Sequence, residues 1–556
     1  MGKDIKKTSN KKRGCLKRGS FFLCKKNGRI SSPAPKDFVS LGMKTSMTKV
    51  IFKDYTQKQL SLLPPSLEEL IEKKHPVRVI NQVIDKVDLQ SLIEKYEGGG
   101  TSSYHPRMML KILVYAYVSN IYSSRKIEAA VKENIHFMWL AAYNRPDHNT
   151  INRFRSDRLK GVFKEIFTQV VMMLVESGHI DLQKVYLDGT KIEANANKYT
   201  FVWGKSIKRY KDGIKNQLEE LWQYAESVAK QEMSLQKPVD FEELDAEKIE
   251  KTIDTINNAL KGKQIDKKKK QKLDYAKKNW SKHYKKYEQQ EEILGERNSY
   301  SKTDTDATFM RMKDDHMKNG QLKAAYNFQI TTSNQYIVNY TNHFNPSDTK
   351  TLIPHLEEFE KQFKILPKEL TADAGYGSEE NYEYLEDKEI AAYVKYNYFH
   401  IEQHKKEKAT PDFHQDKLYY NEKEDFYICP MGQKMNKIGI KKTANERGFT
   451  QELHLYQAQN CNGCPLRGVC HKSKNNKIIQ VNHKLKRYKA KAKKLLLSEK
   501  GKKHISQRPV DVEAVFGNIK QNKKFTRLSL RGIEKVEIEI GLVYLSHNLL
   551  KYAKIA

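Results

Sequence analysis

Strand-like alternation in two separated parts of the chain constrains the fold more than any other feature. Three segments alternate and are rich in aromatic or β-branched side chains, namely 184–192 (KVYLDGTKI), 323–333 (KAAYNFQITTS) and 335–344 (QYIVNYTNHF). Only Asn334 separates the second segment from the third, which predicts a hairpin. The three segments are therefore expected to lie in one sheet.

Helices and further strands continue this pattern toward the C-terminus. They are a helix at 348–363, a strand that ends in ELTADAGYG, a helix from Ser378 and a strand at 390–396. A strand, a hairpin and then alternating helices and strands are typical of a mixed sheet with helices on its faces. The sequence thus predicts an α/β fold.

Two aspartates occupy special places in these strands. The period of two puts Asp188 in the middle of an otherwise core-like strand, where an unpaired carboxylate costs several kcal/mol. Asp373 follows the next apolar strand, at the carboxyl end where α/β sheets hold their ligands. The structural alternatives are a carboxylate that is hydrogen-bonded at the sheet edge and a simple turn residue.

A third acid lies far downstream, in RPVDVEAVFGNIKQNKKFTRLSLRG. Helical spacing puts Glu513, Phe516 and Lys520 on one face, beside an apolar stripe. The flanking cations, which could bind phosphate, are Arg508, Lys523, Lys524, Arg527 and Arg531. Taken alone, such a helix is also typical of a solvated basic surface.

Three carboxylates and a basic chain together suggest one chemistry. Carboxylate oxygens suit Mg²⁺ or Mn²⁺, and two such ions roughly 4 Å apart can cleave and rejoin phosphodiesters. The chain has 101 Lys and Arg against 68 Asp and Glu, a formal charge of +33, which favours a nucleic-acid partner. No apolar run reaches membrane-spanning length, so no membrane partner is expected.

The N-terminal part is predicted to be helical and basic. Residues 60–165 show helical periodicity, and Asp147 is a candidate N-cap for a helix that carries Arg153 and Arg155. We interpret this region as a DNA-binding domain of helix-turn-helix type, with a plain helical bundle as the alternative. Residues 1–46 form a basic arm, expected to be disordered. The arm is either a DNA-grasping tail or sequence upstream of a start at Met43 or Met47.

Two insertions are expected to interrupt the core. Residues 204–298 carry apolar residues at helical spacing, and 397–505 form a second, basic insertion. The core then comprises 180–203, 299–396 and 506–556. The second insertion contains four cysteines, which are Cys429, Cys461, Cys464 and Cys470. They are either the ligands of a structural Zn²⁺ or independent reduced thiols.

The motifs resemble a known family. The blocks YLDGTKIEANANKYTFVW, LTADAGYGSEENY and RPVDVEAVFGNIKQNKKFTRLSLRG resemble the three catalytic blocks of bacterial insertion-sequence DDE transposases, closest to the insertion-sequence eleven-eighty-two group of the IS-four-like clan. The resemblance implies an RNase H-like core, an InsH-type N-terminal domain and the triad Asp188, Asp373 and Glu513. Lys520 matches the lysine of the clan's tyrosine-arginine-glutamate-lysine signature. Ser506 and Pro509 replace its tyrosine and arginine, and Arg508 is offset by one.

The resemblance leads to the functional prediction. We expect a cytoplasmic, nucleoid-associated transposase that binds terminal inverted repeats, cleaves at the transposon ends and joins 3′-hydroxyls to target DNA, as a homodimer or larger synaptic assembly. The alternative is a catalytically silent, sequence-specific DNA-binding regulator on the same fold.

Overall fold

The computed structural model describes residues 66–96, 103–234, 239–312, 320–403, 413–445 and 447–555. All of these described residues belong to one compact unit. The predicted basic arm, residues 1–46, lies outside the described residues.

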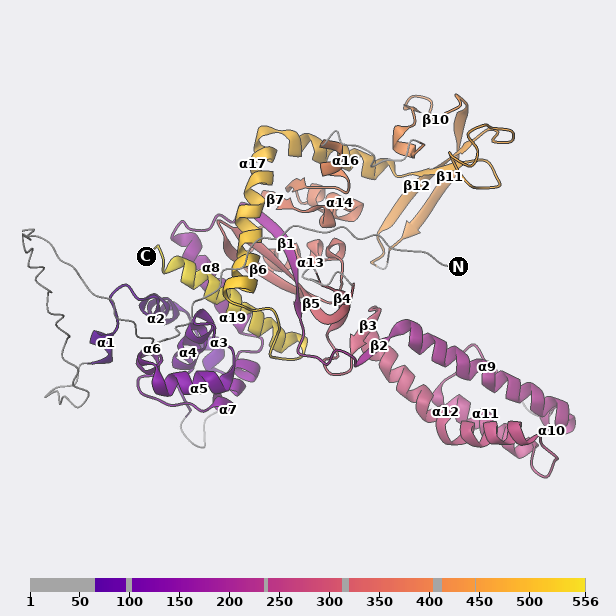
Figure 1. Cartoon of the computed structure of the whole chain (residues 1–556), viewed down its shortest axis with the longest axis horizontal. Coiled ribbons are helices and arrows are strands. Elements are labelled where there is room, and N and C mark those ends of the chain that lie inside the picture. The colour runs from indigo at the N-terminus through magenta and orange to yellow at the C-terminus, as the bar shows by residue number, and fades with distance from the viewer. Residues whose placement is uncertain are drawn as a thin grey trace, which may run out of the picture. The chain divides into compact units, whose positions relative to one another are not determined.

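A six-stranded mixed sheet forms the core (Figure 1). Its strands are β1 (Lys184–Glu193), β4 (Thr308–Arg311), β5 (Leu322–Ser333), β6 (Tyr336–His343), β7 (Glu369–Ala372) and β8 (Ala391–Val394). The strand order is β4-β5-β1-β7-β8, and β6 also pairs with β5. β1, β5 and β6 are antiparallel neighbours, whereas β7 and β8 run parallel to β1. The mixed α/β class predicted from the sequence is confirmed.

The predicted hairpin is present, with a turn of two residues instead of one. Ser333 pairs with Tyr336, and Asn334 and Gln335 both have positive φ, 52° and 62°. Positive φ at both central positions is the requirement of a type I′ turn, whose twist matches that of the flanking strands. Asn tolerates this conformation well, which explains why Asn334 indicates a turn in the sequence.

Short helices separate the strands of the second half. They are the 3-10 turns η2 (Asp348–Lys350) and η3 (Ala374–Tyr376) and the helices α13 (Leu352–Phe363), α14 (Glu379–Asp387) and α15 (Phe399–Gln403). Ser378 caps α14 by accepting a hydrogen bond from the Asn381 amide at 3.2 Å.

The N-terminal region is helical, as the sequence predicts. Its helices are α1 (Leu67–Leu70), α2 (Pro76–Lys86), α3 (Gln90–Ile93), α4 (Pro106–Val118), α5 (Ser124–Glu133), α6 (Ile135–Leu140), α7 (His148–Arg153), the π-helix η1 (Phe154–Arg158) and α8 (Phe163–Glu176). Asp147 caps α7 by accepting from the Thr150 amide at 2.8 Å. The buried C-terminal helix α19 (Ile533–Tyr552) contacts both α4 and β6. It therefore joins the N-terminal helices to the sheet.

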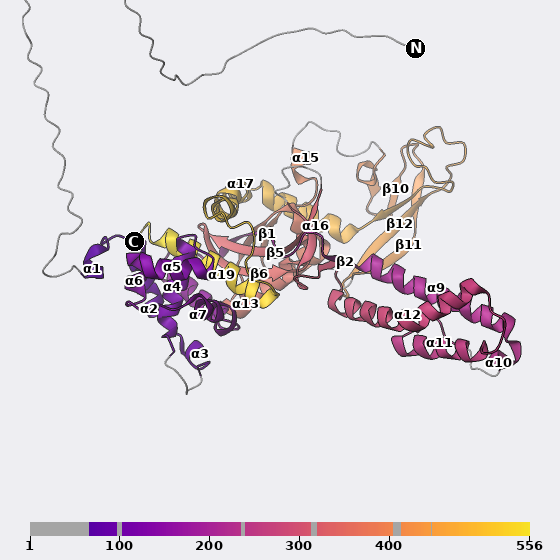
Figure 2. The same ribbon diagram turned by 60° about the horizontal axis from the view of Figure 1, so that its bottom comes forward.

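The first insertion is a helical bundle with its own apolar core (Figure 2). It contains α9 (Gly204–Val228), α10 (Lys230–Ser234), α11 (Ala246–Ala259) and α12 (Lys267–Leu294). It joins the core through the short paired strands β2 (Phe201–Trp203) and β3 (Ser299–Ser301). Leu218, Leu221, Ile256 and Ala276 are fully buried between the helices, which confirms the helical interpretation of their spacing.

The second insertion contains a separate antiparallel sheet. Its strands are β9 (Tyr420–Asn421), β10 (Phe426–Ile428), β11 (Lys434–Ala444), β12 (Thr450–Ala458) and β13 (Ile478–Val481), after the turn η4 (Gln415–Lys417). The chain then returns to the core through α16 (His483–Leu497) and α17 (Glu499–Arg508).

The segment after α17 departs from a regular α-helix. It runs as the π-helix η5 (Pro509–Glu513), a turn of α-helix α18 (Ala514–Gly517) and a second π-helix η6 (Asn518–Asn522). The predicted apolar stripe is confirmed, since Val512, Val515 and Ile519 are all at most 1% exposed. Single-turn π segments occur frequently at functional sites.

Candidate active site

Asp188 and Asp373 are neighbours at the carboxyl edge of two parallel strands. Leu187 of β1 lies opposite Ala372 of β7, so the next residues in the same register are the two aspartates. Adjacent strands are about 4.8 Å apart, and side chains at paired positions of parallel strands point to the same face. The fold therefore sets the two carboxylates side by side, although 185 positions of sequence separate them.

Glu513 reaches Asp188 through Arg508. The guanidinium of Arg508 donates from Nη2 to Asp188 Oδ2 at 3.0 Å and from Nη1 to Glu513 Oε1 at 2.8 Å. Arg508 and Glu513 are five residues apart, at the start and end of the π-helical turn, which places them above one another. Figure 1 shows α17, which ends at Arg508, passing β7 and β1. Asp188 and Asp373 thus lie in neighbouring positions, and Arg508 links Asp188 to Glu513.

Arg508 is almost fully buried in this arrangement. It is 5% exposed, and its Nε has no hydrogen-bond partner among the described residues. A buried guanidinium is strongly disfavoured unless it is paired, so the two carboxylates hold it in place. Instead of the predicted DNA contact, the structure shows Arg508 as the cation between Asp188 and Glu513.

The loop after β7 is packed so tightly that it requires glycine. A Cβ on Gly377 would lie 2.6 Å from the carbonyl oxygen of Lys395, and one on Gly189 would lie 2.5 Å from Gln329 Nε2. Tyr376 is buried and donates its hydroxyl to Gln329. Burial, reinforced by the carboxylates of Asp348 and Asp188, raises the pKa of Tyr376 well above its ordinary value. The AGYG segment is thereby fixed beside the carboxylates.

Lys395 is a site residue that the sequence reasoning missed. It directly follows β8, is 7% exposed, and donates its backbone amide to Ala372 at 3.3 Å. Burial lowers its pKa, the charge of Arg508 lowers it further, and Asp373 and Glu513 oppose both effects. Lys395 directly follows the apolar strand IAAYV, just as Asp373 directly follows its own apolar strand. A charged residue at this position after each of two strands was the sequence signal that could have identified Lys395.

The residues fit a divalent cation, but the described side chains are not arranged as a metal site. Carboxylate oxygens are the ligands that Mg²⁺ prefers, and the position between Asp188 and Glu513 already accommodates a positive group, the Arg508 guanidinium. Among the described residues, however, no cluster of three His, Cys, Asp or Glu is close enough to hold a metal ion.

Besides Arg508, two further predicted DNA contacts lie in the interior. Arg155 is 3% exposed and donates to the Tyr117 hydroxyl at 3.1 Å and the Tyr122 carbonyl at 2.7 Å. Lys523 is 3% exposed and donates to the Tyr117 carbonyl at 3.2 Å, and burial lowers its pKa to about 8. Both side chains tie the end of α4 to neighbouring segments. In this structure both cations are buried and bonded, so a DNA contact by either stays a prediction that would require the side chain to be released.

The other predicted DNA contacts are at least partly exposed. Arg153, Lys524, Arg527 and Arg531 are exposed, and Lys520 is half-buried. Arg527 and Arg531 also donate to the carbonyls of Ala196 at 3.1 Å and Asn195 at 2.8 Å, just after β1. These bonds fix the segment after η6 against the first core strand.

The four clustered cysteines line one small pocket at the end of the second sheet. All four are unpaired thiols. The Lys477 ammonium lies 3.1 Å from Cys470 Sγ, and the Lys477 amide lies 3.4 Å from Cys461 Sγ. The absence of a metal-holding cluster among the described residues applies to these cysteines too.

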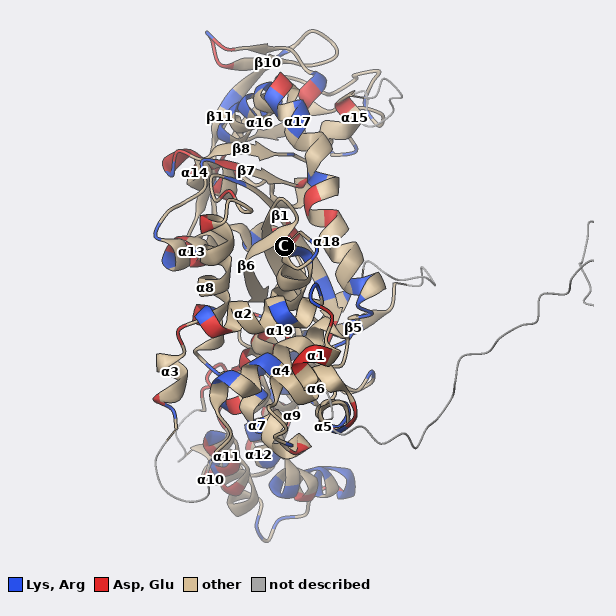
Figure 3. Ribbon diagram, turned by 90° about the vertical axis from the view of Figure 1, so that its left-hand side faces the viewer, with Lys and Arg blue, Asp and Glu red and all other residues tan. Residues whose placement is uncertain are grey.

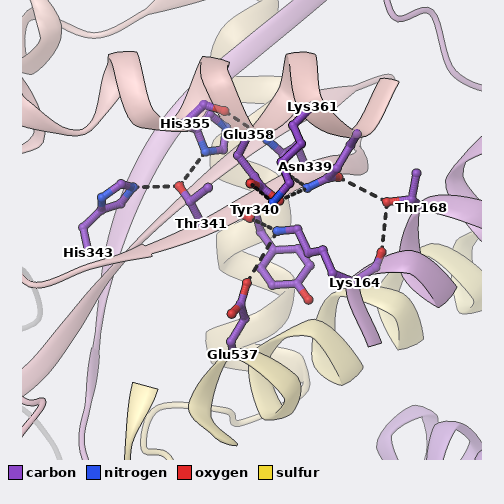
Figure 4. Close-up of polar contacts among 11 residues, drawn as sticks. Lys164, Thr168, Asn339, Tyr340, Thr341, His343, His355, Glu358, Lys361 and Glu537 are labelled. Atoms are coloured by element: carbon purple, nitrogen blue, oxygen red, sulfur yellow. Dashed lines mark hydrogen bonds and ion pairs between the residues drawn. The ribbon is translucent and has the colours of Figure 1, made fainter. Parts of the chain in front are cut away.

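A larger cavity, of about 1010 Å³, lies beside the edge strand β6 and is lined by residues of α8, α13 and α19. Figure 4 shows polar contacts among some of these residues. Lys164 donates to the Tyr340 carbonyl and lies 3.6 Å from the Tyr340 ring centroid, and burial lowers its pKa to about 8. Thr341 is bonded at 2.7 Å to both His343 and His355. These groups join α8, β6 and α13 and have no carboxylate pair comparable to Asp188 and Asp373, so we interpret them as structural.

Two family models match the chain. Residues 65–157 match the Transposase domain (DUF772), and residues 428–553 match the Transposase DDE domain. No curated protein and no solved structure matches the chain. Two regions of the chain are therefore similar to transposase domains. Glu513 and Arg508 lie inside the second match, whereas Asp188 and Asp373 lie outside both.

Within the described residues, no helix is long and apolar enough to span a membrane.

Proposed function

We propose that this protein binds the terminal inverted repeats of its own mobile element, cleaves DNA at the ends and joins the 3′-hydroxyls to target DNA. The observation that carries the proposal is the register that sets Asp188 next to Asp373 at the carboxyl edge of one sheet, with Arg508 bonded to both Asp188 and Glu513. The two matches to transposase models support it independently.

The topology supports an RNase H-like core as part of this proposal. If β4 is set aside, the core strands in chain order are β1, β5, β6, β7 and β8, and their spatial order is β6-β5-β1-β7-β8. The first three are antiparallel and the last two parallel to the first. The first acid lies on the first strand, the second directly after the fourth, and the third on a helix that packs against the first. The resemblance described above leads us to expect this placement.

Asp188, Asp373 and Glu513 are the proposed ligands of the divalent ions. Two bound Mg²⁺ would activate the attacking oxygen and stabilise the leaving oxygen of a phosphodiester. Asp188 and Asp373 present their carboxylates from a rigid sheet edge, which fixes their spacing. Glu513 is more adjustable, since its side chain is 53% exposed and lies on a π-helical turn. Arg508 neutralises Asp188 and Glu513 and keeps the glutamate near the sheet.

The proposed DNA surface comprises exposed cations around the acids and on the N-terminal helices. Beside the acids are Lys520, Lys524, Arg527 and Arg531, and α7 adds Arg153. Figure 3 shows further Lys and Arg on α16 and α17. Several of these pair with acids of α14 and neighbouring elements, for example Lys484 with Glu383 and Lys491 with Glu386 at 2.7 Å. Such pairs position the helices, so only part of the positive charge of the basic segment 471–503 is available to DNA.

Synapsis of two ends would require a dimer or larger assembly.

Zinc at the four cysteines is a separate proposal. Its support is that the four thiols share one pocket and the C-x₂-C spacing of Cys461 and Cys464. Metal analysis of protein purified without chelator tests it. About one zinc per chain, lost together with several degrees of melting temperature in Cys461→Ser, would support it. Metal-free protein with an unchanged melting temperature in that variant would refute it.

The test of the main proposal is cleavage of a duplex that carries the inverted repeat found in the DNA beside the gene. With Mg²⁺ or Mn²⁺, the wild type should nick at the repeat boundary, and Asp188→Asn and Asp373→Asn should not. Nicking that persists in both variants would refute the site. Sequence-specific binding without cleavage in either metal would instead favour the silent regulator.

A further inference from the structure

Three charged residues form a row across the carboxyl edge of the parallel strands. Leu187, Ala372 and Val394 are paired across β1, β7 and β8. The next residues in the same register are Asp188, Asp373 and Lys395. The amide of Lys395 donates to the carbonyl of Ala372 at 3.3 Å, so the ladder extends as far as the lysine. Because the three strands are parallel, the three side chains belong to the same face of the sheet.

The charged groups nearest to Lys395 in their electrostatic effect belong to the candidate active site. The charges that act on its ammonium group are those of Asp373, Arg508 and Glu513. Its fractional exposure of 7% is low for a lysine, since lysines are almost never fully buried without a partner. Yet among the described residues no carboxylate oxygen lies within the 4.0 Å ion-pair distance of its nitrogen. A structural ion pair therefore does not explain why a lysine occupies this position.

The tight packing beneath Lys395 fixes where its side chain begins. Gly377 approaches the Lys395 carbonyl so closely that no other residue type fits without a shift. Tyr382 donates its hydroxyl to the carbonyl of Val394 at 3.0 Å, which holds the end of β8 from the other side. A lysine anchored at such a rigid point presents its charge at a defined place, as an electrostatic catalytic group must.

We propose that Lys395 is a catalytic residue whose ammonium group binds a non-bridging oxygen of the scissile phosphodiester. The inference rests on the proposed function and extends it by one residue. In phosphoryl transfer, negative charge grows on the non-bridging oxygens, and a fixed cation next to them lowers the barrier. Lysine serves as a point charge for phosphate, and Asp373 beside it would orient the ammonium without consuming its three donors.

The first test compares single-turnover cleavage of the end duplex by the full-length wild type, Lys395→Met and Lys395→Arg. The methionine keeps the length of the side chain and removes its charge. We expect the cleavage rate to fall about 10²-fold in Lys395→Met, the typical effect of losing one such donor, and to recover partly in Lys395→Arg. Lys184→Met is the matched control, because this lysine is exposed at the opposite end of β1. Its rate should stay within twofold of the wild type.

The second test separates phosphate binding from a structural role. A neutral methylphosphonate at the scissile position removes the charge that Lys395 is proposed to bind. The wild type should lose far more rate on this substrate than Lys395→Met does. Mn²⁺ affinity, measured by calorimetry, should differ by less than about threefold between the two proteins.

Three outcomes would overturn the inference. They are a Lys395→Met rate within threefold of the wild type, equal sensitivity of both proteins to the methylphosphonate, and a Mn²⁺ affinity that rises markedly in the variant. The last would identify Lys395 as a mere counter-charge of Asp373. If Lys395→Met fails to fold, a Lys395→Arg protein that folds but cleaves both substrates like the wild type would refute a defined phosphate contact. A wild type that cleaves nothing refutes the proposed function itself, which is a distinguishable result.

Discussion

The two faces of the core sheet use buried polarity in different ways. On the α13 face, Asn327, Gln329, Thr331, Asn339 and His355 are all fully buried, and they are bonded to one another or to nearby groups, which include the Asp348 carboxylate. On the α17 face, Asp188, Asp373, Lys395 and Arg508 are charged, and the Nε of Arg508 has no partner among the described residues. A bonded network of mostly neutral groups serves rigidity, whereas charges gathered at the end of parallel strands are costly unless they serve chemistry. We therefore expect a structural role for the α13 face and the proposed chemistry on the α17 face.

The strongest test of this difference between the faces is to remove one carboxylate from each face and compare the cleavage rates. Asp188→Asn should lower the cleavage rate about 10³-fold or more, because a lost metal ligand removes several kcal/mol of transition-state stabilisation. Asp348→Asn is the matched control on the α13 face. Its carboxylate accepts from Asn327 at 2.9 Å and Gln329 at 3.1 Å, so the change should lower stability and leave the cleavage rate within about threefold. An equal loss of cleavage rate in both variants would contradict the expected difference in function between the two faces.

Removing Arg508 should destabilise the metal-free protein. Arg508→Ala leaves Asp188 buried without its cation, and breaking a buried pair costs about 3–5 kcal/mol, less here because the Glu513 side chain is half exposed. Arg508→Lys should recover little, since one ammonium cannot bridge two carboxylates as a planar guanidinium does. Urea unfolding in EDTA measures the loss. Mn²⁺ should restore more stability to Arg508→Ala than to the wild type, and an identical gain in both proteins would contradict a shared cation position.

Acid should weaken the α13 face. Burial lowers the pKa of His343 to about 4 from an ordinary value of 6.5. His343 is therefore neutral in the folded protein, whereas the unfolded chain takes up a proton at this residue below pH 6.5. Its contribution to stability is complete above pH 6.5 and is lost as the pH falls toward 4, by at most about 3 kcal/mol. Melting temperatures from pH 7 to 4 measure this, and His343→Gln should flatten part of the slope. A slope unchanged in that variant would exclude His343 as its source.

The smallest expected effect comes from Thr341, the hydroxyl between two histidines. Thr341→Val keeps the shape and leaves His343 and His355 each without one bond of 2.7 Å. The free energy of unfolding should fall by about 1–3 kcal/mol, the cost of unsatisfied buried polar groups. The cleavage rate at a temperature where the variant is folded should not change. A rate loss greater than tenfold would show that the α13 face takes part in catalysis.

Local patterns predicted the elements of this fold well. The apolar stripe of Val512, Val515 and Ile519, the cap at Ser378 and the turn at Asn334 are all present. Each depends on residues within a few positions of one another, so a single sequence contains the necessary information. The predicted helix that carries Arg153 and Arg155 is divided between α7 and η1, because a π-turn does not alter the apolar spacing enough to be seen.

By itself, then, the sequence determined the residue types of the site: hard oxygen ligands at strand ends, cations around a third acid, and a basic chain suited to DNA. Only the tertiary structure decided which of these residues meet. The register between β1, β7 and β8 aligns Lys395 with the aspartates, and a π-turn places Arg508 over Glu513. Packing against α4 buries Arg155 and Lys523. Strand register and burial depend on partners hundreds of residues away in the sequence. Local propensity therefore cannot predict which residues pair or become buried.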